Sequence, residues 1–159
     1  LAYNDTGAHF FAGLAIGSLT DQEILAAGCA GALKEATGSV WDNGDLAATL
    51  AGGIEAWIHK RGTDEHLFWG FVALEAMQAG NMCWQQDNGY YEINPIYGRH
   101  PSRDRIYLTK AAECVFARIV AWNMDEPKRS TFLRWCHYAV LAMMAYDTYH
   151  NIPILHIAF

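Results

Sequence analysis

The sequence lacks the short motifs by which many enzymes and cofactor-binding proteins are recognised. It contains no GxSxG nucleophile motif, P-loop, dinucleotide fingerprint or EF-hand loop. Its four cysteines, Cys29, Cys83, Cys114 and Cys136, form no CxxC pair, which argues against a structural zinc site and a thioredoxin-type centre. Because all four lie in apolar stretches, we expect buried free thiols, with disulfides as the alternative.

The chain is also poor in charge, and its net charge is negative. Charged residues make up 18% of the 159 residues, hydrophobic residues make up 52%, and the net charge is −6. Nucleic-acid binding requires a basic surface, so we exclude nucleic acids as partners. The sequence has one short basic run: Arg99, Arg103, Arg105 and Lys110. We interpret this run as a solvated helix start rather than a phosphate or headgroup site.

A third absence is a long uninterrupted apolar run. A membrane-spanning helix needs about 20 mostly apolar residues, and the nearest candidate, residues 67–84, contains Glu75 and Gln78. The sequence therefore favours a water-soluble or membrane-associated bundle over a spanning one. Small residues recur at i, i+4, as at Gly13 and Gly17, and this spacing suits close helix packing in water or in lipid.

Helix signals dominate the chain and predict an all-α bundle of five or six helices, in a single domain over residues 1–159. Thr20 and Glu23 have the spacing of a capping box for the second helix, and Asp45 is expected to cap the third. Residues 86–102 are predicted to form one long ordered loop. The expected helices cover residues 8–17, 20–36, 45–60, 63–85, 103–123 and 128–150, with those after residue 63 packed on those before residue 60.

Four polar residues, His9, Glu35, Asp42 and Asp45, stand in the apolar first third of the chain. Histidine with carboxylates suits zinc or manganese, so one hypothesis makes these four the ligands and catalytic residues of a metal-dependent hydrolase. The favoured interpretation is structural: Lys34 or His9 pairs with Glu35, while the two aspartates cap a helix. We therefore expect no metal and no other cofactor.

A second polar group is expected to serve the long loop. Glu75 and Gln78 lie at i, i+3 and so share one helix face. The favoured interpretation is that they hold the loop through hydrogen bonds to its backbone. The alternative is a small-ligand carrier in which the loop lines a pocket. The candidate ligand-binding residues are Glu75, Gln78, Tyr90, Tyr91, Glu92 and Asn94.

Two stretches of the chain resemble the patterns of known families. The first stretch contains a His-Phe motif, a Lys-Glu pair and an Asp-Leu-Ala segment, formed by His9, Phe10, Gly13, Lys34, Glu35, Asp42, Asp45, Leu46, Ala47, Gly52 and Gly53. This pattern, over about residues 7–53, resembles the periplasmic lipoproteins of the YfiM-like family, which are envelope proteins of bacteria and their phages. Residues 75–102 resemble small bacterial and phage membrane proteins with a Glu-x-Asn-Pro-x-x-Gly motif, here with Tyr97 where Leu is usual.

The resemblance implies a compartment, and a non-enzymatic function is our leading expectation for the chain. The chain begins at Leu1 rather than Met, and position 1 holds no lipid-attachment cysteine. We therefore expect an exported protein of the periplasm or cell envelope whose leader has been removed. It would act without catalysis, by packing against a membrane surface or against envelope or phage proteins, and self-association is a further possibility.

Overall fold

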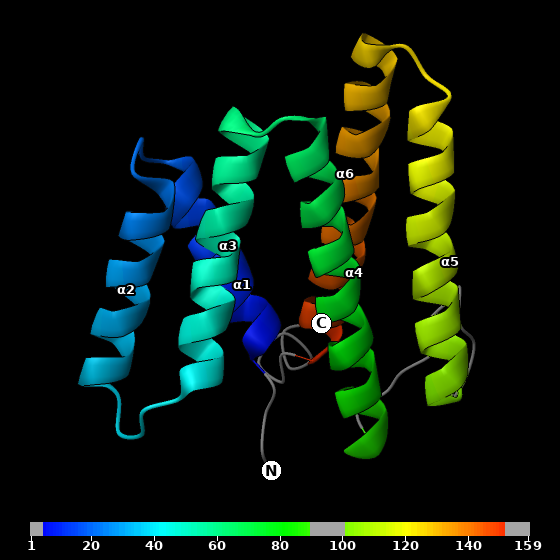
Figure 1. Ribbon diagram of the computed structural model, residues 1–159. Coiled ribbons are helices and arrows are strands. Elements are labelled where there is room, and N and C mark those ends of the chain that lie inside the picture. Colours follow the sequence, from blue (N-terminus) through cyan, green and yellow to red (C-terminus); the bar gives the residue numbers. More distant parts are fainter. Residues whose placement is uncertain (1–4, 90–100, 152–159) are drawn as a thin grey trace. The chain divides into compact units, whose positions relative to one another are not determined.

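The computed structural model describes residues 5–89 and 101–151, and within these ranges the chain folds into six α-helices and no strands (Figure 1). The all-α prediction is confirmed. The helices are α1 (Thr6–Ser18), α2 (Glu23–Thr37), α3 (Asn43–Arg61), α4 (Asp64–Asp87), α5 (Arg103–Trp122) and α6 (Glu126–Asn151). No helix in these ranges has both the length and the apolar character needed to cross a membrane.

The chain divides into two compact units. The first unit contains residues 1–63 and 145–159, and the second contains residues 64–144. The first boundary lies close to the expected division between residues 60 and 63. The end of α6, however, groups with the N-terminal helices rather than with α4 and α5.

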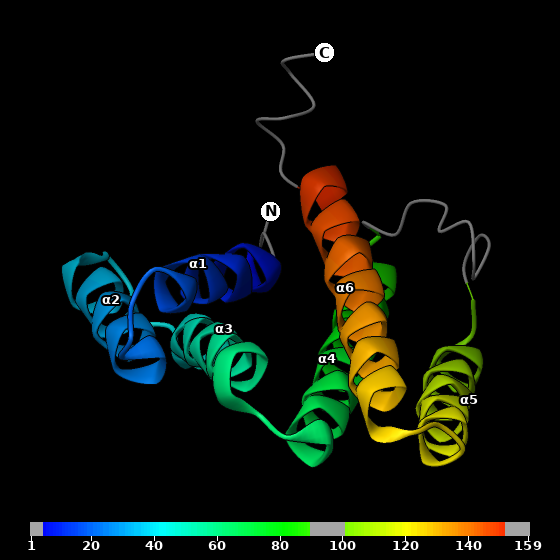
Figure 2. The same ribbon diagram turned by 90° about the horizontal axis from the view of Figure 1, so that it is seen from above.

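In the first unit, α1 lies beside α3 (Figure 2), and glycines on both helices bring the two backbones into contact. A Cβ atom added at Gly13 of α1 would lie 1.9 Å from the carbonyl oxygen of Thr49 in α3. A Cβ atom added at Gly52 of α3 would lie 2.1 Å from the carbonyl oxygen of Phe10 in α1. Only glycine fits at these two positions, because any side chain would separate the helices.

The start of α2 differs from the prediction. The helix begins at Glu23, its N-cap residue is Gln22, and no side chain caps it, so the predicted capping box at Thr20 is wrong. The Glu23 carboxylate lies instead 3.3 Å from Arg61 and 3.6 Å from Lys60 at the end of α3. Glu23 is buried, so the two cations compensate the charge that it carries out of water.

The start of α3 also differs. Asp42 is the N-cap residue, and its Oδ1 accepts a hydrogen bond of 2.7 Å from the backbone N–H of Gly44. The prediction that Asp45 caps this helix is therefore wrong, because Asp45 lies within the first turn. Its carboxylate is left available for contacts with α1 and α2.

In the second unit, α4 and α5 pack around a small core that contains Met82 and Ile106. Ser102 caps α5 by accepting a hydrogen bond of 3.2 Å from the backbone N–H of Arg105. We predicted that the basic residues at this helix start are solvated. Arg103 and Arg105 are exposed, but the prediction is wrong for Lys110, which is only 4% exposed.

The cysteines are free thiols, as expected, but they are not all buried. Cys83 is buried, Cys114 and Cys136 are partly buried, and Cys29 is exposed on α2. The expectation of burial is therefore wrong for Cys29, because its position on α2 faces away from α1 and α3.

The contact between α1 and α3 gives a first test. Gly13→Ala should lower the free energy of unfolding by about 1–3 kcal/mol, because the added methyl group meets the Thr49 carbonyl. Gly80→Ala is the matched control, since a Cβ there meets no atom within 4 Å. That substitution should raise stability by about 0.5–1 kcal/mol, the usual gain for alanine in a helix. Urea denaturation measures both, and equal effects would contradict the close packing.

Candidate functional site

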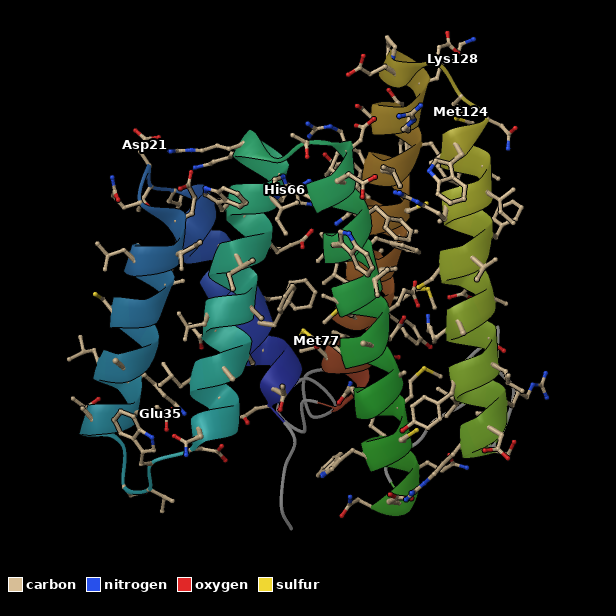
Figure 3. The ribbon with its side chains drawn as sticks, viewed as in Figure 1. Asp21, Glu35, His66, Met77, Met124 and Lys128 are labelled. Carbon is tan, nitrogen blue, oxygen red and sulfur yellow. The ribbon has the colours of Figure 1, made fainter. Side chains whose placement is uncertain are left out.

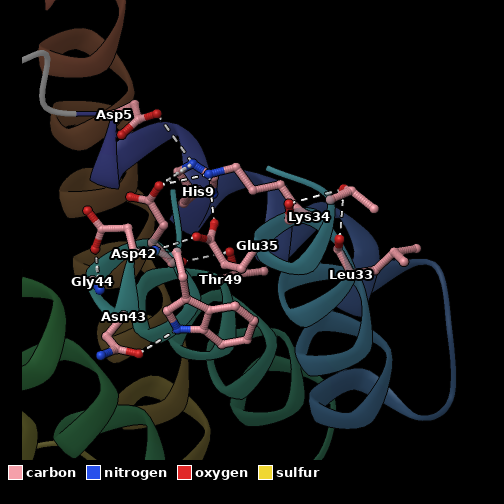
Figure 4. A network of polar contacts seen from close by, with 12 residues as sticks. Asp5, His9, Leu33, Lys34, Glu35, Asp42, Asn43, Gly44 and Thr49 are labelled. Atoms are coloured by element: carbon pink, nitrogen blue, oxygen red, sulfur yellow. Dashed lines mark hydrogen bonds and ion pairs between the residues drawn. The ribbon is translucent and has the colours of Figure 1, made fainter. Parts of the chain in front are cut away.

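A polar network links α1, α2 and α3 at one end of the first unit (Figure 4). His9 of α1 faces two carboxylates. Its Nε2 lies 3.4 Å from Oδ2 of Asp5, one turn earlier, and 3.2 Å from Oδ2 of Asp45 in α3. His9 and Asp45 are largely buried, whereas the Asp5 side chain is 41% exposed. The imidazole therefore sits between a solvent-facing acid and a protected one.

Lys34 connects this group to α2. Its Nζ donates a hydrogen bond of 2.9 Å to Oδ2 of Asp45 and lies 2.7 Å from Oε1 of Glu35. The other oxygen of Glu35, Oε2, accepts a hydrogen bond of 2.6 Å from the backbone N–H of Asp42. Every carboxylate oxygen of the buried Glu35 therefore has a cationic or N–H neighbour.

These contacts shift the pKa values of the pair in opposite directions. Hydrogen bonds from Lys34 and then from the Asp42 backbone hold the pKa of Glu35 below its usual value. Hydrogen bonds to Glu35 and then to Asp45 raise the pKa of Lys34 above its usual range. Both groups are therefore charged at neutral pH.

The structure brings together three of the four predicted residues, His9, Glu35 and Asp45. Asp42 reaches the network only through its backbone N–H, because its side chain caps α3. The four-residue catalytic set of the hydrolase hypothesis is therefore not assembled as predicted. Asp5 was missed, although its i, i+4 spacing to His9 is a local signal that points to contact.

A second buried cluster lies in the second unit, between α4 and α5. The Nζ of Lys110 lies 2.6 Å from Oε2 of Glu75 and 3.0 Å from Oε2 of Glu113, and it donates a hydrogen bond of 2.6 Å to Oε1 of Gln78. Glu75, Gln78 and Lys110 are each less than a tenth exposed. Glu75 and Gln78 therefore share a helix face that contacts Lys110, a residue that we predicted to be solvated.

The second cluster holds one ammonium between two carboxylates, which leaves an excess negative charge. Burial raises the pKa of Glu75 to about 7, with the Lys110 hydrogen bond acting against this rise and Glu113 adding to it. Burial also raises the pKa of the Cys114 and Cys136 thiols to about 11. Both thiols are therefore protonated at neutral pH and are poor nucleophiles.

Four of the candidate ligand-binding residues, Tyr90, Tyr91, Glu92 and Asn94, lie outside the described residues, as does most of the expected loop. The pocket and the ordered loop stay predictions. Of the six candidates, the structure describes Glu75 and Gln78, and it places both against Lys110.

No protein-family model, curated protein or solved structure matches this chain. The two clusters are therefore interpreted from their own geometry.

The first cluster predicts how stability depends on Glu35. Glu35→Ala should lower the thermal unfolding midpoint by several degrees at pH 7, because Lys34 and the Asp42 N–H lose a buried partner. A lowered pKa means that the contribution of Glu35 is present above its unfolded pKa of about 4.5 and is lost on acidification. The effect of the substitution should therefore shrink below pH 4.5.

The control for Glu35 is Asp21→Ala, which removes an exposed carboxylate from the other end of α2 (Figure 3). It should change the midpoint little at any pH. Thermal unfolding followed by circular dichroism from pH 3 to pH 8 measures both variants. Similar small changes in the two would show that Glu35 is not a structural partner.

The second cluster predicts the opposite pH dependence. The pKa of Glu75 is raised from 4.5 to about 7, so its contribution to stability is complete below pH 4.5 and is lost as the pH rises through 7. Glu75→Gln should flatten the stability profile between pH 5 and pH 7.5, because the amide carries no titrating charge. Glu65→Gln, at an exposed position on the same helix, should keep the wild-type slope. Denaturant unfolding across this pH range measures the free energy of unfolding of the wild type and both variants. The same pH dependence in all three proteins would contradict a titrating Glu75 in this cluster.

Proposed function

We propose that the protein is an envelope-associated helical protein that acts without catalysis, by packing the outer faces of its helices against lipid. The observation that carries this proposal is the distribution of polarity. In the described helices, many large apolar side chains are exposed, while several charged side chains are buried together with apolar residues such as Leu67 and Ile106. Charged groups in proteins are almost never fully buried unless they are paired.

The outer faces of α2 and α5 carry apolar side chains at helical spacing. On α2, Leu25 is 63% exposed and Leu33 is 66% exposed. On α5, Leu108, Val115 and Ile119 are 71%, 59% and 51% exposed, and the residues that separate them on this face are Ala111 and Ala112. A contiguous apolar face of this kind marks a surface that contacts a membrane or a protein.

Buried charged side chains in the described helices have ionisable partners. Glu55 of α3 is buried and lies 2.9 Å from Nε2 of His59, one turn later. In the second unit, Glu75 and Lys110 lie 2.6 Å apart. Ionisable side chains that face the interior of a bundle and pair with one another are typical of proteins in lipid, where a charge on the outer face is expensive.

Lipid is favoured because exposed apolar side chains occur in each unit. Binding of a helix to a membrane surface grows with the apolar area that it buries there. The outer face of α6 adds Trp135 and Tyr138, whose rings pack edge to face with centroids 6.0 Å apart and are 68% and 50% exposed. Tryptophan and tyrosine are enriched where proteins meet the membrane–water interface.

The resemblance of residues 7–53 to the YfiM-like periplasmic lipoproteins supports the envelope as the compartment and a bacterium or phage as the source. The acidic net charge of −6 disfavours attraction to anionic lipid headgroups. The proposed contact is therefore with the apolar part of the membrane, and further copies or envelope proteins would join through the same faces.

Vesicle flotation tests this proposal. The full chain should float with phosphatidylcholine vesicles, and the double variant Leu108→Glu/Ile119→Glu should lose binding by about tenfold or more, because charges are costly in lipid. The control Asn123→Glu adds one of these charges at the exposed C-cap of α5, outside the apolar face, and should float like the wild type. A wild-type chain that stays in the aqueous fraction, or a double variant that floats equally well, would refute the proposal.

A further inference from the structure

We propose that Asp5, His9 and Asp45 form a binding site for a first-row divalent metal cation such as Zn²⁺. The site lies where the start of α1 meets the first turn of α3 (Figure 4). It is independent of the lipid contact, and it replaces the set of four residues that the sequence suggested as a metal site by three that the fold brings together.

The separations between the ligand atoms fit a metal site. The Nε2 of His9 lies 3.4 Å and 3.2 Å from the two carboxylate oxygens, and all three atoms lie within 4.8 Å of one another. Tetrahedral ligands at zinc bond lengths of about 2.0–2.1 Å are separated by about 3.3 Å. Both separations lie at or beyond the long end of the range of about 2.7–3.2 Å that is usual for N–H···O hydrogen bonds, and a single N–H could only be shared between the two carboxylates.

The orientation of Asp5 is a second and separate observation. Asp5 is the N-cap residue of α1, where an aspartate ordinarily accepts a hydrogen bond from the first turn of its helix. Its side chain makes no capping hydrogen bond and is directed at His9 instead. The Asp5 carboxylate thus faces His9, which also faces Asp45, and this orientation suits a metal ligand.

The charge of the network also calls for a divalent cation. Asp5, Asp45 and Glu35 bring three negative charges, and Lys34 brings one positive charge, while a metal-bound histidine is neutral. A divalent ion would balance the remaining two negative charges. The mixed nitrogen and oxygen ligands favour zinc or manganese over magnesium or calcium.

Lys34 competes with the cation for Asp45. Its Nζ lies 2.9 Å from the same Oδ2 that faces His9, but the lysine side chain is 49% exposed and also contacts Glu35. It can therefore turn to Glu35 when a metal binds. Because the Asp5 side chain is partly exposed, the remaining coordination position would be open to water.

Calorimetric titration of the full chain with zinc chloride at pH 7.5 tests the site. We expect about one equivalent of Zn²⁺ per chain, and Asp5→Asn and His9→Gln should each weaken binding at least about tenfold. His66→Gln is the control, since His66 is an exposed histidine at the start of α4 (Figure 3), and its affinity should match the wild type. The Asp5 side chain is partly exposed and does not cap α1, so we expect its substitution to leave the fold intact, as circular dichroism can verify.

Lys34→Gln separates this site from non-specific binding. Removing the competing ammonium should tighten zinc binding, whereas a surface that binds zinc without this geometry would be indifferent to the change. Magnesium chloride should give no heat under the same conditions. The proposal is overturned if the wild type does not bind zinc, if Asp5→Asn and His9→Gln bind as the wild type does, or if Lys34→Gln leaves the affinity unchanged or lowers it.

Discussion

The contact between the backbones of α1 and α3 is the constraint on which the first unit depends. Gly13 and Gly52 let the two helices approach until a single methyl group would collide with a carbonyl oxygen. Helices this close leave little volume between them, so the interior is filled by small residues such as Ala27 and Ala48. Phe10 is buried beside this contact, whereas Leu33 of α2 lies outside. The glycine contact thus limits the size of the side chains that fit between α1 and α3.

Hydrogen bonds and ion pairs also hold both ends of α3 against the neighbouring helices and the turn before α2. At its end, Lys60 donates to the carbonyl of Thr20 at 2.7 Å and Arg61 donates to that of Asp21 at 2.8 Å. At its start, Asp45 meets His9 and Lys34. Cations are favourable at a helix C-terminus and anions at its N-terminus, so both sets of contacts agree with the helix dipole. The close packing in the middle is therefore fixed at both ends by charge.

Much of the fold could be predicted from the sequence, because helix signals are local, but the partners of buried charges could not. The pattern of Thr20 and Glu23 indicates a capping box, yet cations of α3 draw the Glu23 carboxylate away, and they lie far along the chain. Lys110 looked solvated for the same reason, since its three acceptors include two on another helix. Asp5 differs from these residues, because its i, i+4 spacing to His9 is a local signal that predicts contact. We missed it because we grouped His9 with Glu35, Asp42 and Asp45 instead.

The glycine contact also explains why the candidate cation site lies where it does. His9 stands one turn before Gly13 on α1, and Asp45 stands one turn before Thr49 on α3. Because Gly13 touches Thr49, the residues one turn earlier on both helices are brought opposite each other, and His9 faces Asp45 at 3.2 Å. The close approach of α1 and α3 thus also sets the spacing of the polar side chains at this end of the unit. The contact between Gly13 and Thr49 therefore accounts both for the close packing of α1 on α3 and for the position of His9 opposite Asp45.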